Sequence, residues 1–176
     1  MAAEIVGFRA AVPSDAEAVA AIHDAAWRST YQGIIPHLHL ERMIARRGPL
    51  WWQRQIERGA NTTLLVFNGV PQGYASWGRA RGAWPWPVGE IFELYVSPPF
   101  QGVGLGRRLF GAVKGQLRRN GFDRLVVWAL KENEPACGFY GALGGAVAAS
   151  AAEHYGEISL TRIAFVWGVS VKSSKA

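Results

Sequence analysis

The stretch Gln101-Gly102-Val103-Gly104-Leu105-Gly106 decides how this chain folds. It follows an apolar, β-rich segment at residues 89–96 and precedes residues 105–117, where leucine and valine recur at helical spacing. Glycines between a strand and a helix let several backbone N–H groups converge. The unpaired amides and the dipole of the helix's first turn then favour an anion. The stretch therefore predicts a phosphate-binding turn inside a mixed α/β domain.

Spacing separates the kinds of phosphate-binding turn that share such glycines. A P-loop needs a lysine followed by serine or threonine after its last glycine, where this chain has Arg107-Arg108. The dinucleotide fingerprint needs its third glycine one residue beyond Gly106. It also needs an acidic residue at the end of the next strand, whereas Asp123 stands at the beginning of that strand. Both patterns fail.

A third pattern fits. Gln101-x-x-Gly104-x-Gly106 resembles [RQ]-x-x-G-x-[GA], the acetyl-CoA signature of the GCN5-related N-acetyltransferases (GNAT family). The preceding run, Glu93-Leu94-Tyr95-Val96-Ser97-Pro98-Pro99-Phe100, resembles that family's fourth strand and the turn after it. The resemblance extends over the whole chain through the order of its elements, and it is most specific over residues 91–143. The alternative is a glycine-rich turn that binds no ligand.

The resemblance implies a single α/β domain, the GNAT fold, with a mixed six- to seven-stranded sheet and helices on both faces. We expect the domain at residues 1–168, followed by a small, polar, flexible tail at 169–176. Ser14 and Glu17 indicate a capping box at the start of the first helix. Strands are expected at 5–11, 62–67, 71–79, 89–96, 123–130, 146–152 and 157–167, and helices at 14–28, 38–58 with a break at Gly48-Pro49, 105–119 and 134–143.

Acetyl-CoA is the cosubstrate that the resemblance implies. The backbone N–H groups of Gln101, Gly102, Val103, Gly104, Leu105 and Gly106 would then hold its pyrophosphate. Arg107 or Arg108 would meet its 3′-phosphate, or both would simply be solvated. In this family a bulged fourth strand splays from the fifth, which would free the backbone of Leu94, Tyr95 and Val96 to pair with pantetheine.

Acetyl transfer from a thioester needs a proton for the leaving thiolate, and a tyrosine hydroxyl can supply one. Residues 133–140 (NEPACGFY) resemble the family's motif B, which makes Tyr140 the general acid and gives Asn133 a contact with pantetheine. The alternatives are a core aromatic at Tyr140 and a plain N-cap at Asn133. The family usually continues with Leu-Gly-Phe, whereas this chain has Leu143-Gly144-Gly145, which predicts looser packing there.

Glu93 is the candidate base for the attacking amine, directly or through a water. It could instead bind a cationic acceptor, or be an ordinary exposed strand residue. His154 is a weaker candidate base. His23, His37 and His39 look like helix-surface or loop residues, and they form no metal-ligand set. Cys137 is expected to be a small buried thiol rather than a nucleophile.

Aromatic residues mark the regions that form the acceptor pocket in this fold. They could wall a pocket for an apolar or cationic amine, with core packing as the alternative role. The candidates are Trp27, Tyr31, Trp84, Trp86 and Tyr155.

Composition narrows the function classes. The net charge is +6, but the lysines and arginines are scattered, which argues against nucleic acid as a partner. No apolar run approaches the ~20 residues of a spanning helix, so no membrane partner is expected. The single cysteine and an N-terminus without a signal-peptide pattern favour the cytoplasm.

The sequence therefore predicts an acetyl-CoA-dependent N-acetyltransferase that acts on the primary amine of a small molecule and uses no metal. One alternative is a protein or peptide N-acetyltransferase, and another is a CoA-binding sensor without turnover. Many members of the family dimerise, so the resemblance also implies a homodimer as an available assembly.

Overall fold

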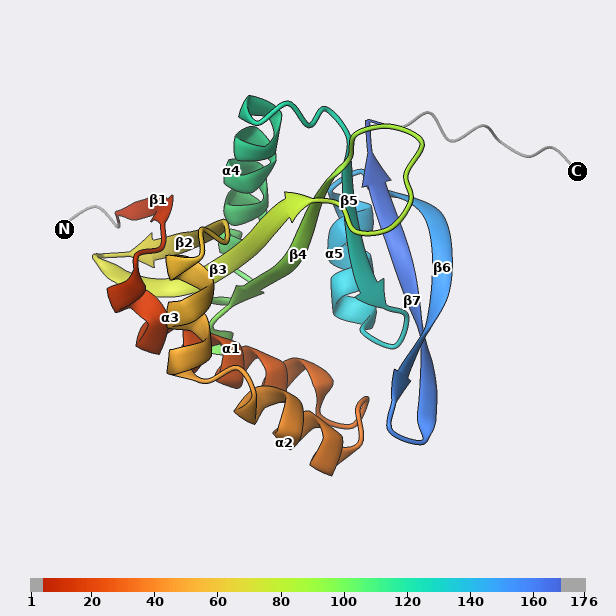
Figure 1. Cartoon of the computed structure of the whole chain (residues 1–176), viewed down its shortest axis with the longest axis horizontal. Coiled ribbons are helices and arrows are strands. Elements are labelled where there is room, and N and C mark those ends of the chain that lie inside the picture. The colour runs from red at the N-terminus through yellow and green to blue at the C-terminus, as the bar shows by residue number, and fades with distance from the viewer. Residues whose placement is uncertain (1–4, 169–176) are drawn as a thin grey trace, which may run out of the picture.

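A computed structural model describes residues 5–168, and the tail predicted at 169–176 lies outside this range (Figure 1). Short 3₁₀ turns at Pro13–Asp15 and Pro98–Phe100 precede two of the helices. The strands are β1 (Val6–Ala10), β2 (Thr62–Phe67), β3 (Val70–Arg79), β4 (Gly89–Val96), β5 (Leu125–Leu130), β6 (Ala146–Tyr155) and β7 (Ile158–Trp167), and the helices are α1 (Ala16–Tyr31), α2 (His37–Ala45), α3 (Pro49–Glu57), α4 (Leu105–Arg119) and α5 (Glu134–Ala142).

The seven strands form one mixed sheet in the order β1-β2-β3-β4-β5-β7-β6. Every neighbouring pair is antiparallel except β4 and β5, which are parallel and flank α4 as a crossover unit. Asn68 and Gly69 turn the β2–β3 hairpin with φ of 49° and 83°, the left-handed values that a tight hairpin turn needs. The predicted mixed α/β sheet is confirmed.

The sheet divides at its parallel pair. Strands β4 and β5 are in register only from Gly89 to Ile91 on β4 and from Leu125 to Val127 on β5. On the other side of β4, the register with β3 skips Phe92, so the strand carries a bulge there. Beyond Ile91, β4 is no longer paired with β5, which confirms the expected splay between these two strands.

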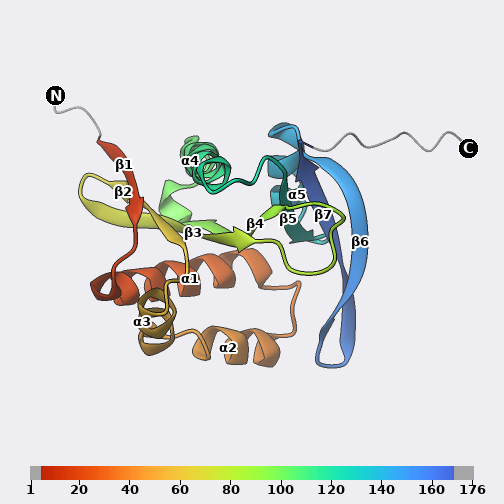
Figure 2. The same ribbon diagram turned by 45° about the horizontal axis from the view of Figure 1, so that its top comes forward.

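Helices cover both faces of the sheet, as predicted. Figure 2 shows α1, α2 and α3 on one side and α4 and α5 on the other. The largest buried cluster joins α4 and α5 to the sheet through Leu109, Val113 and Tyr140. On the opposite face Val19 and Trp52 pack against Tyr74. Helices α1–α3 do not cover the part of that face formed by β5 and β7. There Trp84 and Trp86 of the β3–β4 loop pack against the cluster that contains Val126.

The first helix begins differently from the capping box predicted at Ser14. The carboxylate of Asp15 accepts the Val12 N–H at 2.8 Å and binds both terminal nitrogens of Arg9, at 2.7 and 2.8 Å. The Ser14 assignment is therefore wrong: Ser14 lies inside the 3₁₀ turn, Asp15 is the residue before α1, and the Asp15 carboxylate bonds back to Val12 and Arg9 and not forward into the helix. Among residues 5–168, no helix is long and apolar enough to cross a bilayer.

Candidate active site

The glycine stretch forms a tight turn at the N-terminus of α4. Gly102 and Gly104 have φ of 78° and 84°, a backbone region that residues with a Cβ rarely adopt. Helix α4 starts at Leu105, and Arg108 is the first residue to donate back into the turn, to the Gly104 carbonyl at 3.2 Å. The amides of the first helical turn thus have no helical carbonyl to bind, which suits an anion.

The flanks of this turn are held by side chains. The side-chain amide of Gln101 donates an N–H to the Val96 carbonyl at 2.8 Å, which joins the turn to the end of β4. This carbonyl belongs to the backbone that was predicted to pair with pantetheine, so one of its acceptors is already used. A Cβ added to Gly106 would come within 3.5 Å of the Phe139 ring. Arg107 and Arg108 are both exposed, and the guanidinium of Arg108 lies over Phe8 at 5.9 Å.

A narrow slot of about 50 Å³ follows from the divergence of β4 and β5. It gathers predicted residues that lie far apart in the sequence, from the bulged strand β4 and from α5. Since the edge of β4 that faces β5 has no strand partner beyond Ile91, the slot can take an extended ligand as if it were another strand. Its lining comprises Tyr31, Phe92, Glu93, Leu94, Tyr95, Val127, Trp128, Ala129, Asn133, Ala136 and Tyr140.

Tyr140 lines this slot with 6% of its surface exposed. The rings of Phe139 and Phe165 pack around it, and this burial raises the pKa of its hydroxyl, so Tyr140 is protonated at neutral pH. Asn133 is also buried, and its Oδ1 accepts the Ala136 N–H at 3.2 Å as the N-cap of α5.

The departure from the family's Leu-Gly-Phe pattern has a packing explanation. A Cβ at Gly145 would lie 2.6 Å from the Trp167 ring, so this ring occupies the space beside the helix end. Trp167 also donates its indole N–H to the Leu143 carbonyl at 2.9 Å. The looser packing expected after α5 is therefore wrong, because a tryptophan from β7 fills the gap.

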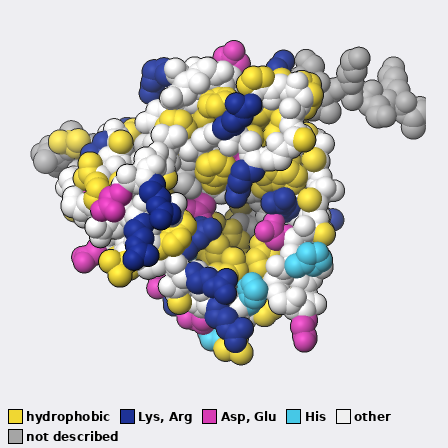
Figure 3. All heavy atoms as spheres, in the orientation of Figure 1, with side chains coloured by type: hydrophobic (Ala, Val, Ile, Leu, Met, Phe, Trp, Pro, Cys, Tyr) yellow, Lys and Arg dark blue, Asp and Glu magenta, His cyan; other side chains and the backbone are white. Residues whose placement is uncertain are grey.

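A larger cavity of about 480 Å³ lies between α1–α3 and strands β2–β7. Figure 3 shows a hollow on this face, where hydrophobic side chains lie among charged ones. The cavity and the slot share Tyr31, Phe92, Glu93, Tyr95, Trp128 and Ala129. The remaining lining residues are Trp27, Met43, Arg47, Trp51, Trp52, Gln55, Ala60, Thr62, Ser76, Arg81, Leu130, Glu153, Tyr155 and Arg162.

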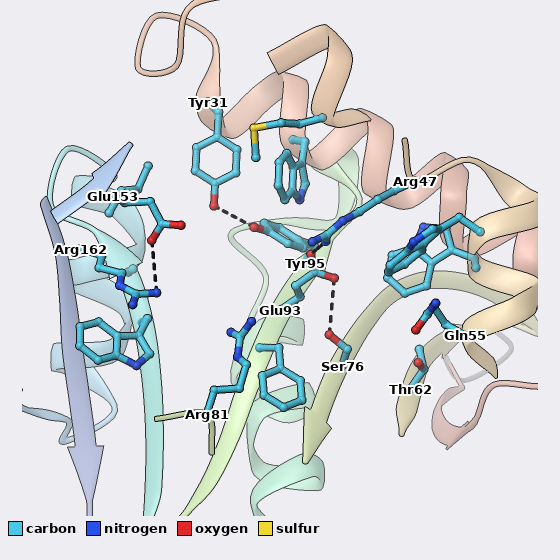
Figure 4. Close-up of a pocket in the computed structure, with 18 of the residues that line it drawn as sticks. Tyr31, Arg47, Gln55, Thr62, Ser76, Arg81, Glu93, Tyr95, Glu153 and Arg162 are labelled. Atoms are coloured by element: carbon cyan, nitrogen blue, oxygen red, sulfur yellow. Dashed lines mark hydrogen bonds and ion pairs between the residues drawn. The ribbon is translucent and has the colours of Figure 1, made fainter. Parts of the chain in front are cut away.

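Glu93 stands where the slot meets the cavity (Figure 4). Its side chain is 10% exposed and forms an ion pair with Arg47, while its other oxygen accepts from Tyr74 at 3.3 Å and Ser76 at 3.4 Å. Burial raises the pKa of Glu93, although Arg47 and the hydroxyls act in the opposite direction. Glu93 is therefore not the exposed strand residue that was one of its alternatives.

Three of the five predicted acceptor aromatics line the cavity, namely Trp27, Tyr31 and Tyr155. The hydroxyls of Tyr31 and Tyr95 lie 2.8 Å apart and join α1 to β4 (Figure 4). Trp84 and Trp86 lie outside it. Both pack on the sheet next to Val126, and Trp84 donates to the Arg81 carbonyl at 3.1 Å.

Sequence reasoning missed three arginines in the cavity wall. Arg47 follows α2, Arg81 pairs with buried Glu90 at 2.7 Å, and Arg162 pairs with Glu153 at 3.2 Å. In the sequence each looks like a scattered surface charge. The place of Glu153 could have been predicted from the alternation of side chains along β6. Glu153 and Tyr155 both face the cavity. His154, between them, is exposed on the other face of the strand, away from the acceptor cavity.

His23 corrects a second expectation, because it is fully buried instead of lying on a helix surface. Its ring lies between Trp27, at 4.6 Å, and Trp52, at 5.9 Å. Neither ring nitrogen has a hydrogen-bond partner among the described residues. Burial, and then the charge of Arg47, lower the pKa of His23 to about 3, so the ring is neutral.

Two candidate chemistries find little support in the geometry. Cys137 is half-buried with its sulfur 3.4 Å from the Leu130 carbonyl, and burial raises the pKa of its thiol, which keeps it protonated. In the part of the chain that the structure describes, no three His, Cys, Asp or Glu side chains gather as a metal site.

Comparison with known proteins matches this architecture. The family model described as "Acetyltransferase (GNAT) family" matches residues 36–144, more than half of the chain. The uncharacterized N-acetyltransferase YuaI of Bacillus subtilis is 29% identical over 136 residues, 77% of this chain and 78% of that protein. The L-methionine sulfoximine/L-methionine sulfone acetyltransferase of Salmonella typhimurium is 30% identical over 99 residues, which are 56% of this chain and 58% of that one.

Among solved structures, the PaiA N-acetyltransferase of Thermoplasma acidophilum, in complex with coenzyme A, superposes with a TM-score of 0.73. The alignment covers 90% of this chain and 98% of that chain at 16% identity, so it speaks to the fold alone.

Proposed function

The chain belongs to the acetyltransferase (GNAT) family, and from this premise we propose that it transfers the acetyl group of acetyl-CoA directly to the primary amine of a small molecule. The observation that carries the proposal is the junction of two spaces. A narrow slot lies between β4, β5 and α5, a wider cavity adjoins it, and Glu93 lines both.

The residues of the slot and the turn fit acetyl-CoA. Gly102 and Gly104 have left-handed backbone conformations and form the turn that leads into α4. The free amides of the first turn of α4 favour binding of a pyrophosphate. The divergence of β4 and β5 leaves room for pantetheine beside Leu94 and Tyr95. Bound there, acetyl-CoA supplies the thioester from which the acetyl group is taken.

The chain itself manages the protons. Glu93 accepts one from the incoming ammonium, directly or through a water, and its raised pKa makes it a stronger base than an exposed glutamate. Tyr140 holds a proton on its Oη at neutral pH and can give it to the leaving sulfur. The two groups line the same slot, so base and acid serve one reacting centre.

The shape of the acceptor cavity favours a small molecule over a peptide. Aromatic side chains from α1, α3, β4, β5 and β6 line this cavity of about 480 Å³, the size of a small-ligand pocket. A relative at 30% identity carries a name with two small amino-acid derivatives as its substrates. The presence of both Glu93 and Tyr140 argues against a sensor without turnover. The homodimer and the cytoplasmic location stay predictions of the sequence.

The test is thiol release from acetyl-CoA with a panel of amines, amino acids, polyamines and peptides, with mass spectrometry of the products. We expect release only with primary amines, and N-acetylated small molecules as products. Acetylation of peptides alone would replace the proposal by its peptide alternative. If CoA raises the melting temperature but no acceptor gives thiol release, the sensor replaces it.

A further inference from the structure

The ion pair between Arg47 and Glu93 indicates which amines the cavity accepts. We infer that the acceptor carries a carboxylate beside its amine, and that Arg47 binds this carboxylate when the amine takes Glu93. The inference rests on the proposed function, since it assigns a substrate class to the same cavity.

The pair occupies the place that an amine must reach. Glu93 lies where slot and cavity meet, and Arg47 approaches it from the connection between α2 and α3 (Figure 4). The side chains are only 33% and 10% exposed. One Glu93 oxygen is held by Arg47 and the other already accepts from Tyr74 and Ser76, so an ammonium group that takes the first oxygen must displace Arg47.

Displacement has a different consequence for the other arginines of the cavity. Arg81 keeps Glu90 and Arg162 keeps Glu153 whatever happens at Glu93. Among the described residues of the cavity wall, Arg47 is therefore the guanidinium that loses its carboxylate when the acceptor arrives. Its charge, two-thirds buried, must then be met by the acceptor.

An amino carboxylate solves this problem and a simple amine does not. Its ammonium replaces Arg47 on Glu93, and its carboxylate replaces Glu93 on Arg47, so each buried charge keeps an opposite charge. A simple amine leaves Arg47 without a partner, and an unpaired buried charge is strongly unfavourable. A guanidinium also binds a carboxylate with two parallel hydrogen bonds, which a point charge cannot do.

Two tryptophans hold Arg47 in position for this exchange. Its guanidinium carbon lies 5.4 Å from the centre of the Trp27 ring and 5.1 Å from that of Trp51. Cation–π contacts of this kind persist when an ion pair opens, because they do not involve the carboxylate. Arg47 therefore stays at the wall of the cavity and presents its charge there.

The experiment compares acceptors that differ only by a carboxylate: L-phenylalanine against phenethylamine, and L-methionine against 3-(methylthio)propylamine. We expect the wild-type kcat/KM to favour the amino acid by about 100-fold, toward the lower end for a broken buried pair because Arg47 is one-third exposed. In Arg47→Gln the preference should fall below about tenfold, mainly through a higher KM for the amino acid.

Matched variants separate recognition from folding. Arg46→Gln removes the adjacent, exposed arginine and should keep the wild-type preference. Arg47→Lys keeps the charge but loses the two-pronged contact, so its preference should lie between the wild type and Arg47→Gln. Calorimetric binding of the amino acid to the CoA complex gives a readout that does not depend on turnover.

Each outcome decides one question. Equal kcat/KM for an amino acid and its decarboxylated amine overturns the inference and leaves the proposed function standing. An unchanged preference in a folded Arg47→Gln protein overturns the role of Arg47. Absence of thiol release with any acceptor overturns the proposed function itself.

Discussion

The two ends of the active site are built in opposite ways. The cofactor end uses backbone: a glycine turn, the first amides of α4 and the unpaired edge of β4, all within residues 92–108. The acceptor end uses side chains from α1, α2, α3 and six strands, which meet only in the folded protein. Cofactor binding should therefore be lost when the backbone conformation changes. Acceptor binding should be lost when single charged or aromatic side chains change.

The largest effect is expected where the two ends meet. Tyr140→Phe keeps the ring that packs against Phe139 and Phe165 and removes the hydroxyl alone. We expect kcat to fall by about 10² to 10⁴, the usual contribution of a general acid, with CoA affinity unchanged. Steady-state kinetics and calorimetry of CoA binding measure the two quantities. A loss of kcat below fivefold would reduce Tyr140 to a packing residue.

Acid should weaken the acceptor end first, because His23 lies buried behind it. The pKa of His23 is about 3 in the folded protein, below its ordinary value of 6.5. The unfolded chain therefore binds a proton that the native state refuses, and stability falls as pH drops from 6.5 toward 3. Between pH 7 and pH 5 the loss is about 2 kcal/mol.

His23→Leu should remove this dependence. The difference in unfolding free energy between variant and wild type, from denaturant titrations at pH 7 and pH 5, should shift by that amount in favour of the variant at pH 5. A constant difference at the two pH values would mean that His23 becomes protonated in the native state.

Gly104→Ala tests the backbone end. Gly104 has φ of 84°, and a left-handed residue with a Cβ costs about 1–2 kcal/mol. The free variant should relax out of this conformation, so CoA should bind about five- to thirtyfold more weakly. The KM of the acceptor should not change. Gly111→Ala is the matched control, because this exposed glycine inside α4 has space for a Cβ and ordinary helical geometry. It should leave CoA affinity unaltered.

The smallest effect concerns the pH profile of the acceptor end. Arg47 lowers the pKa of Glu93, while burial raises it. Activity needs the carboxylate, so kcat/KM rises with pH through this pKa. Arg47→Gln should raise the pKa of Glu93 further and move the acid limb to higher pH. A limb that stays in place or moves to lower pH would show that Glu93 is not the group that titrates.

The same contrast explains what could be predicted from the sequence. The glycine turn, the α5 cap at Asn133 and the place of Tyr140 follow local patterns, and the structure has each of them at the expected residues. Arg47 could not be identified, because nothing local distinguishes it from Arg46. Its role depends on Glu93, 46 residues further along the chain.

The acceptor role predicted for Trp84 and Trp86 is not matched by the cavity lining, for a related reason. Trp84 and Trp86 lie in a proline-rich loop that the sequence correctly makes irregular, but irregularity does not tell which surface a loop covers. The loop packs over Val126, on a part of the sheet that α1–α3 leave uncovered. His23 was misplaced because a polar residue on an amphipathic helix usually faces water, and here two tryptophan rings enclose it.

The divergence of β4 and β5 has a consequence for cohesion as well as for binding. Within residues 5–168, β4 and β5 are in register over only three residue pairs, from Gly89–Leu125 to Ile91–Val127, so few backbone hydrogen bonds join the two parts of the sheet. Local opening should therefore start there, and amide hydrogens of β4 beyond Ile91 and of β5 beyond Val127 should exchange with solvent faster than those of β3. A ligand that fills the slot contacts both parts of the sheet. At a concentration of a hundred times its Kd, it raises the free energy of separating the two parts by about 2.7 kcal/mol.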